Sequence, residues 1–164
     1  MYRRGHKGVL LLLYAPFLVV MLILELYVFA VLGLVISLSL VMLPDKDQSV
    51  PMMKHRGFTH TIWFASLVGL GMALVGMTLA PILIFAGVDA TPVILFLGFI
   101  GVFSIVAHLF ADSLTPAGVK PWTPVSGRRH SGSINANSFL GNWVLWLLGL
   151  VAILGGLYIA LIWL

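Results

Sequence analysis

The chain has 164 residues, of which 61% are hydrophobic and only 9% are charged. A soluble domain carries about 25% charged residues, so the composition excludes an ordinary soluble protein and predicts one integral membrane domain over residues 1–164. The chain has no cysteine, which excludes disulfides and thiolate metal sites. Its formal charge of +4 favours anionic lipid headgroups or phosphorylated substrates as partners, and we expect no nucleic acid.

The first apolar run covers residues 8–43 and is interrupted only by Pro16 and Glu25. A spanning helix needs about 20 residues, and a single helix over this run would be about 54 Å long. We therefore expect two helices, 8–24 and 27–43, although the turn between them has no glycine or proline. One long, tilted helix is the alternative. The basic start resembles a signal peptide, but the run is too long for one, which favours an uncleaved first helix.

Three further apolar runs follow. Thr59 is a candidate cap for the first of them, and Gly87 and Pro92 indicate a turn between the first and the second. The polar segment 120–138 precedes the last run. These runs predict helices over 59–86, 92–114 and 139–163. The expected fold is all-α, a polytopic bundle of about five transmembrane helices.

This topology sorts the polar residues by side. Glu25 and Asp89 fall on one side of the membrane. The opposite side receives all nine lysines and arginines and every other histidine and acid: His6, Asp45, Asp47, His55, His60, His108, Asp112 and His130. By the positive-inside rule that side is cytoplasmic. We therefore expect a multi-pass protein of the cytoplasmic (inner) membrane with a cytoplasmic N-terminus.

Two polar islands hold candidate metal ligands. His108 and Asp112 are spaced i, i+4, so a helix places both on one face. Asp45 and Asp47 follow Pro44 on a segment that we expect to be extended, where alternate side chains point to opposite faces. Asp45 is then the favoured ligand, while Asp47 binds a second metal or orients a histidine. Without cysteine, such ligands suit zinc, manganese, magnesium or iron.

The remaining candidates lie near the start of the third expected helix, near the N-terminus and in the polar segment 120–138. His60 would lie in the first helical turn and His55 in the loop before it, so both can reach one site. Arg56 beside a helix N-terminus attracts phosphate. His6 precedes the first helix on the same side. The last candidates are Arg128 and Arg129, for which lipid headgroups and substrate phosphate both remain open, and His130, which reads equally well as a solvated loop residue.

Three motifs carry a family resemblance: Leu43-Pro-Asp-Lys-Asp47, His55-Arg-Gly-Phe-Thr-His-Thr61 and His108-Leu-Phe-Ala-Asp112 with the Ser-Leu-Thr-Pro-Ala-Gly-Val that follows it. In this order, and with a histidine before the first helix, they resemble the YdjM/YbcI-like membrane proteins, described as membrane-bound metal-dependent hydrolases. The resemblance spans roughly residues 1–125, with Thr61 where the family often has serine. It implies metal-binding roles for His6, Asp45, His60, His108 and Asp112.

The order of these ligands is also similar to that of the zinc-dependent phospholipase C and single-strand nuclease superfamily, which hydrolyses phosphodiesters with clustered zinc. That superfamily has a later ligand pair that this chain lacks, so one or two ions are expected, zinc first and manganese or magnesium as alternatives. The resemblances imply a hydrolase at the cytoplasmic interface, acting on a phosphoester or lipid-linked substrate. Asp47 or His55 would be the general base or orient a ligand, and Arg56, Arg128 and Arg129 would receive phosphate.

Two rival functions follow from the same residues. A non-enzymatic membrane protein could use the metal as a structural clamp between helices. A metal or proton carrier would need ionisable groups near the midplane, and the ligands cluster at one surface instead. The proposed metal site requires that His60 and His108 lie at the same end of the bundle. The oligomeric state is open.

Overall fold

The computed structural model describes residues 1–49 and 55–163. Within these ranges the chain forms the α helices α1 (Arg3–Ile23), α2 (Tyr27–Leu40), α3 (Ile62–Phe85), α4 (Ala90–Ser113) and α5 (Phe139–Trp163), with the short 3₁₀ helices η1 (Pro44–Ser49) and η2 (Phe58–His60). The described residues contain no strand, only an isolated bridge between Val119 and His130. All five α helices are long and apolar enough to cross a membrane, α2 when counted through Ser49. The all-α, five-span prediction is confirmed.

The first apolar run is a helical hairpin, and the alternative of one long helix is wrong. The chain turns at Glu25, which adopts a φ of 58°, a left-handed conformation that is uncommon outside glycine. This conformation makes a turn without glycine or proline. α1 begins at Arg3, so the expectation that His6 precedes the first helix is wrong: His6 lies in the first two turns of α1.

The second hairpin joins α3 and α4. Gly87 (φ 74°) lies in the turn that follows α3, as expected. The carboxylate of Asp89 caps α4 by accepting from the backbone N–H of Thr91 at 2.8 Å. The hydrogen bonds from Thr91 lower the pKa of Asp89. At the other end of α3 the cap is Thr61, which accepts from the N–H of Phe64 at 3.3 Å. The prediction that Thr59 is the cap is therefore wrong.

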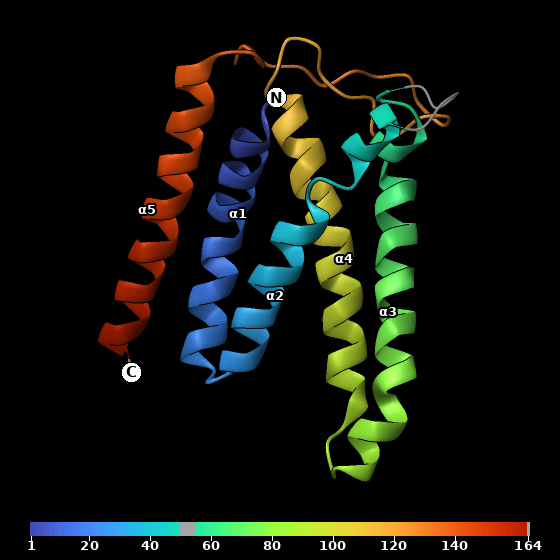
Figure 1. Ribbon diagram of the computed structural model, residues 1–164, viewed down its shortest axis with the longest axis vertical. Helices are drawn as coiled ribbons and strands as arrows, with labels where there is room; N and C mark the ends of the chain where they lie inside the picture. The colour runs from blue at the N-terminus through green and yellow to red at the C-terminus, as the bar shows by residue number, and fades with distance from the viewer. Residues whose placement is uncertain (50–54, 164) are drawn as a thin grey trace.

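The centre of the bundle is formed by α1, α2 and α4. One core cluster joins Tyr14 and Leu18 of α1, Ala30 of α2 and Ile100 of α4. The Tyr14 hydroxyl donates to the Ala30 carbonyl at 2.7 Å, which removes the only polar atom of that cluster's side chains from the apolar interior. The outer helices flank this centre (Figure 1): α5 packs mainly on α1, and α3 packs mainly on α4.

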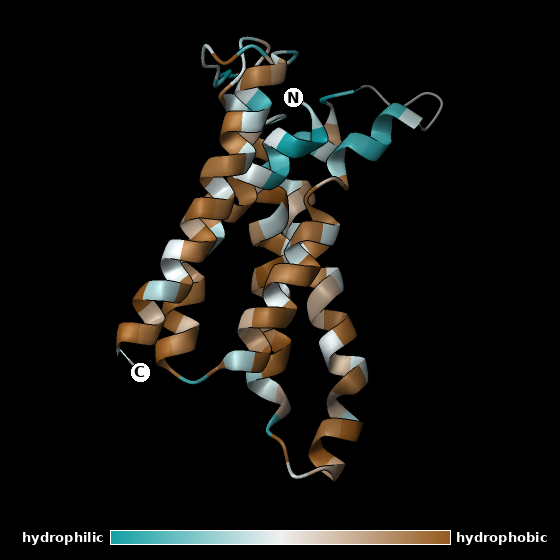
Figure 2. Ribbon diagram, turned by 60° about the vertical axis from the view of Figure 1, so that its left-hand side comes forward, coloured by the Kyte–Doolittle hydropathy of each residue, from teal (hydrophilic) through white to brown (hydrophobic). Residues whose placement is uncertain are grey.

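Polar residues gather at one end of the bundle. Figure 2 shows η1, η2 and the N-terminus at this hydrophilic end, while the helices below it are mostly apolar. The turns of both hairpins and the C-terminal end of α5 lie at the opposite end (Figure 1). The predicted grouping of histidines and acids on one side is therefore what the fold produces. Of the nine cations in that grouping, Lys54 lies outside the described residues.

Candidate metal centre

Four segments far apart in the sequence place ionisable side chains together at the polar end. α1 contributes His6, η1 contributes Asp45, η2 contributes His60, and the last turns of α4 contribute His108 and Asp112. Four of these residues are 1% exposed or less, and Asp45 is partly exposed. Burying so many ionisable groups in one place is costly unless they are paired or bind a metal.

Four atoms of this group lie close together. The Nε2 atoms of His60 and His108 lie 3.2 Å apart. Asp45 Oδ1 lies 3.5 and 3.6 Å from these two nitrogens, and Asp112 Oδ2 lies 3.5 and 3.7 Å from them. Around a tetrahedral ion with bonds of about 2.0–2.2 Å, neighbouring ligand atoms are about 3.3–3.6 Å apart. The histidine–histidine and histidine–carboxylate spacings are close to this range, so each carboxylate oxygen could share an ion with both histidines.

The hydrogen bonds of the two histidines leave their Nε2 lone pairs free. His108 Nδ1 lies 2.8 Å from the Val41 carbonyl, which only accepts, so this nitrogen carries the proton. His60 Nδ1 lies 3.0 Å from Thr59 Oγ1, whose own proton goes to Asp47. When both rings are neutral, their Nε2 atoms are therefore acceptors that face each other, 3.2 Å apart, and two carboxylates. A cation between them removes this repulsion, and a partner on Nδ1 is what metal-binding histidines usually have.

His6 lies beside these four atoms. Its ring stacks on His108 with centroids 4.2 Å apart. Its Nε2 lies 3.4 Å from Oδ1 of Asp112, the carboxylate oxygen that does not belong to the four-atom group. Both His6 Nε2 and Asp112 Oδ2 are buried without a hydrogen-bond partner. The residues also divide into two triplets, His6–His108–Asp112 and Asp45–His55–His60, each with ligand atoms within 4.8 Å of one another. The arrangement therefore has room for one or two ions.

Asp47 supports the site from behind. Its Oδ2 accepts from Thr59 Oγ1 at 2.8 Å, and its Oδ1 lies 2.9 Å from His55 Nδ1. The expected extended segment is wrong, because Asp45 and Asp47 lie on the 3₁₀ helix η1. Both carboxylates approach the His60 ring: Asp45 Oδ1 lies 3.5 Å from Nε2, and Asp47 Oδ2 lies 3.5 Å from Nδ1. The side chain of His55 is 42% exposed.

Arg56 connects the centre to a cavity of about 210 Å³. Its Nη2 donates to Asp112 Oδ1 at 3.2 Å and its Nη1 to the Gly118 carbonyl at 3.0 Å. We call this the basic cavity; its lining is His55, Arg56, Ala117, Gly118, Val119, Lys120 and Arg129. Arg129 lines the same cavity as Arg56, and its role in binding phosphate stays a prediction. Arg128 is exposed and outside this lining, so its contact with substrate stays a prediction.

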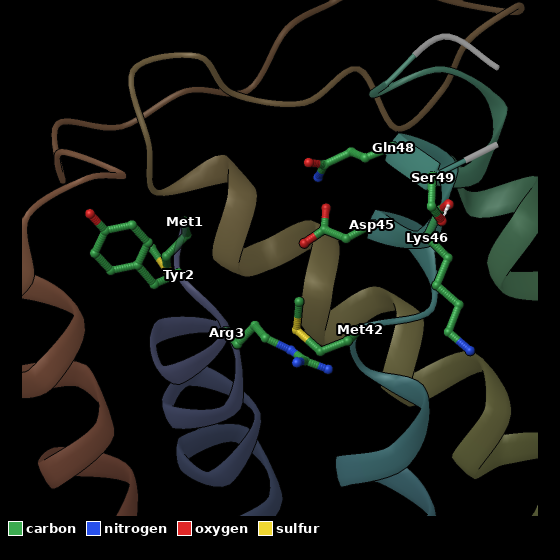
Figure 3. Close-up of a pocket in the computed structure, with 8 residues that line it drawn as sticks. All are labelled: Met1, Tyr2, Arg3, Met42, Asp45, Lys46, Gln48 and Ser49. Carbon is green, nitrogen blue, oxygen red and sulfur yellow. Dashed lines mark hydrogen bonds between the residues drawn. The ribbon is translucent and has the colours of Figure 1, made fainter. Parts of the chain in front are cut away.

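A second cavity, of about 420 Å³, reaches the centre at Asp45. We call it the amphipathic cavity; it is lined by Met1, Tyr2, Arg3, Met42, Asp45, Lys46, Gln48 and Ser49. Figure 3 shows the carboxylate of Asp45 and the amide of Gln48 projecting from η1 toward the N-terminal end of α1, with Arg3 and Met42 below them. Asp45, with 18% of its side chain exposed, joins this cavity to the buried ligand atoms.

Sequence reasoning missed two residues of the site. Thr59 was interpreted as a helix cap, yet its position directly before His60 in a histidine motif was a signal for a supporting role. Lys120 lines the basic cavity but lies after a turn, where spacing carries no information on direction. His130, by contrast, is exposed and its backbone pairs with Val119, in agreement with the reading as a loop residue.

Comparison with known proteins identifies the family. No curated protein and no solved structure matches the chain. The family described as YdjM inner membrane protein matches residues 9–164. The match begins after His6 and extends beyond the three motifs through α5. Because it covers nearly the whole length, the chain belongs to the YdjM inner membrane protein family.

Proposed function

We propose that this protein is a membrane-embedded, metal-dependent hydrolase of phosphoesters or lipid-linked phosphates, with its site at the cytoplasmic interface. One observation carries the proposal: two histidine lone pairs and two carboxylate oxygens face one another at 3.2–3.7 Å. The cytoplasmic assignment rests on the described lysines and arginines at the same end of the bundle.

His60, His108, Asp45 and Asp112 would hold the ion, and His6 with Asp112 Oδ1 would complete the site or begin a second one. Two nitrogen and two oxygen donors suit zinc, while the two carboxylates keep manganese and magnesium as alternatives. When bound, such an ion lowers the pKa of a coordinated water and polarises the bond under attack.

His55 is suited to move the proton. Its Nδ1 is held by Asp47 at 2.9 Å, which fixes the ring and leaves the other nitrogen for a substrate or a water. Since the side chain is partly exposed and lines the basic cavity, it can exchange protons with solvent. Asp47 then has two tasks, orienting His55 directly and His60 through Thr59.

The basic cavity is suited to an anionic substrate group. Arg56 and Arg129 line it together with Lys120, and none of its lining residues is acidic. Arginine binds phosphate oxygens with charge-assisted hydrogen bonds, often in pairs. Because Arg56 also touches Asp112, a phosphate bound there would lie directly beside the metal ligands.

The test combines metal analysis of the purified protein with a hydrolysis screen on phospholipids and simple phosphoesters. The variant is Asp112→Asn, and its matched control is Asp89→Asn, which makes the same change at the opposite end of the bundle and keeps a helix-capping side chain. We expect metal and hydrolysis in the wild type and in the control, and loss of both in Asp112→Asn. Bound metal without turnover of any ester would contradict the enzyme.

A structural clamp is the second candidate, because the ligand atoms come from α1, η1, η2 and α4. One ion bound by all of them would tie these segments together. A structural ion has a closed set of protein ligands, whereas a catalytic ion keeps an open or water-filled position. Spectroscopy of the cobalt-substituted protein separates the two: a signal that changes with added phosphate indicates an open position, and an unchanged signal indicates the clamp.

A further inference from the structure

The metal centre lies between two cavities of different chemistry, which together describe the shape of a ligand. The amphipathic cavity reaches it from the side of Asp45. The basic cavity reaches it from the side of Arg56, whose guanidinium contacts Asp112. A molecule bound at the centre could therefore extend into the amphipathic cavity with one part and into the basic cavity with another part.

The amphipathic cavity suits the apolar part of a lipid. It lies where α1 begins and α2 has just ended, so it opens at the depth where the helices leave the apolar layer. Met42 and Tyr2 give it apolar walls, and Arg3 and Lys46 stand at its exposed edge (Figure 3). Cations beside an apolar wall are typical of contact with an anionic amphiphile at the membrane surface.

The basic cavity suits an anionic group and lacks an apolar wall of comparable size. Alanine and valine are its only apolar side chains, and three cations and His55 line the rest. The backbone bridge between Val119 and His130 fixes Arg129 beside Lys120. The guanidinium of Arg56 lines this cavity and donates to Asp112 Oδ1 at 3.2 Å. An anionic group bound in this cavity would thus lie next to a phosphate held at the metal centre.

We infer that the site takes an amphiphile with two consecutive phosphates, a lipid diphosphate. Its hydrocarbon arm would lie along Met42 and Tyr2, its first phosphate at the metal ligands, and its second phosphate against Lys120 and Arg129. This inference rests on the proposed function and specifies its substrate class. A lipid monophosphate would leave the basic cavity empty, and a soluble diphosphate would leave the apolar wall uncovered.

The probes are farnesyl diphosphate, farnesyl monophosphate and inorganic pyrophosphate, the last two each lacking one part of the inferred ligand. Binding to the metal-loaded, detergent-solubilised protein is measured by calorimetry. We expect farnesyl diphosphate to bind at least about tenfold more tightly than either partial probe, since each cavity adds a favourable contact. Equal affinity for the two farnesyl compounds would overturn the role of the basic cavity.

Variants assign each part of the ligand to its cavity. Lys120→Ala should weaken farnesyl diphosphate about tenfold and leave farnesyl monophosphate unchanged, and Lys120→Arg should restore the affinity. Met42→Gln should weaken both farnesyl compounds and leave pyrophosphate unchanged. Lys7→Ala removes a cation from the same end of the bundle outside both linings, and should change none of the three. Uniform weakening by all variants would contradict the inference.

Hydrolysis separates this inference from the function on which it rests. Turnover of a simple monophosphate ester that Asp112→Asn abolishes, without preference for the lipid diphosphate, would overturn the substrate class and keep the hydrolase. Selective binding of farnesyl diphosphate without turnover of any ester would overturn the hydrolase and keep the binding site.

Discussion

At the scale of single residues, the protonation of two imidazoles decides what the site can do. The Val41 carbonyl and the Thr59 hydroxyl hold the protons of His108 and His60 on Nδ1. When neutral, each ring therefore presents its Nε2 as an acceptor to the centre, where the two Nε2 atoms lie 3.2 Å apart. The Thr59–Asp47 hydrogen bond is the one link of this arrangement that can be removed without touching a proposed ligand.

The first prediction concerns this link. Thr59→Val removes the hydroxyl that accepts from His60 and donates to Asp47, so the ring loses its orientation. We expect metal affinity to fall about 10–100-fold, as for other supporting partners of metal ligands, measured by competition with a chromophoric chelator. Thr78→Val is the matched control, because that exposed hydroxyl bonds only the Val75 carbonyl in its own helix. Unchanged affinity in Thr59→Val would rule out the supporting role.

The second prediction concerns metal removal. Without an ion, the acceptors of His60, His108 and Asp112 face one another in a buried place, so the folded state should lose stability. An ion present at 100 times its dissociation constant stabilises by about 2.7 kcal/mol. We expect a chelator to lower the Tm in detergent and stoichiometric zinc to restore it. His130→Ala should respond as the wild type does, and a Tm indifferent to chelator in both proteins would contradict a bound ion.

At the scale of elements, helix contacts set where the ligands stand. α1 holds His6 only if it keeps its place between α4 and α5, and at Gly8 its backbone lies against that of α5. A Cβ at Gly8 would collide with the backbone of Leu145, and one at Gly149 would collide with the backbone of Gly8. These two glycines let the helices meet backbone to backbone, as small residues do in membrane bundles.

The third prediction tests this contact. Gly8→Ala should force α1 and α5 apart, and we expect destabilisation of about 1–3 kcal/mol, the usual range for an overpacked contact. Thermal unfolding in detergent measures it. Gly155→Ala is the matched control, because no atom lies within 4 Å of a Cβ there. Equal stability of the two variants would show that the close approach is not required.

At the scale of the whole molecule, all candidate ligands and the described cations share one end, and both hairpin turns share the other. This polarity predicts the orientation in the membrane by the positive-inside rule. It also places the candidate site where the apolar helices give way to the polar loops (Figure 2).

The fourth prediction tests that orientation. The chain has no cysteine, so single cysteines report position without interference. Val88→Cys lies in the α3–α4 turn and Val125→Cys in the polar loop, and both side chains are exposed. In intact spheroplasts an impermeant maleimide should label Val88→Cys, and it should label Val125→Cys only after lysis. The reverse pattern would place the metal centre on the outer side.

The sequence by itself determined the number and approximate extent of the helices and which polar residues gather at one end of the bundle. These are properties of local composition: an apolar run has the length of a span, and the number of crossings fixes the side. For the same reason, the i, i+4 spacing of His108 and Asp112 predicts that both side chains lie on one face of a helix.

Only the tertiary structure decided which atoms face one another. Four features differ from the sequence-based expectation because they depend on contacts between segments distant in sequence. α1 begins before His6, and Asp45 and Asp47 lie on a 3₁₀ helix. Thr59 supports the site and does not cap a helix, and Lys120 lines the basic cavity. Helix rotation and loop conformation are set by such packing, in which a single turn or register shift moves a side chain by several ångströms. The sequence pattern therefore predicts which residues belong to the metal centre, while packing sets the distances between them and forms the two cavities beside it.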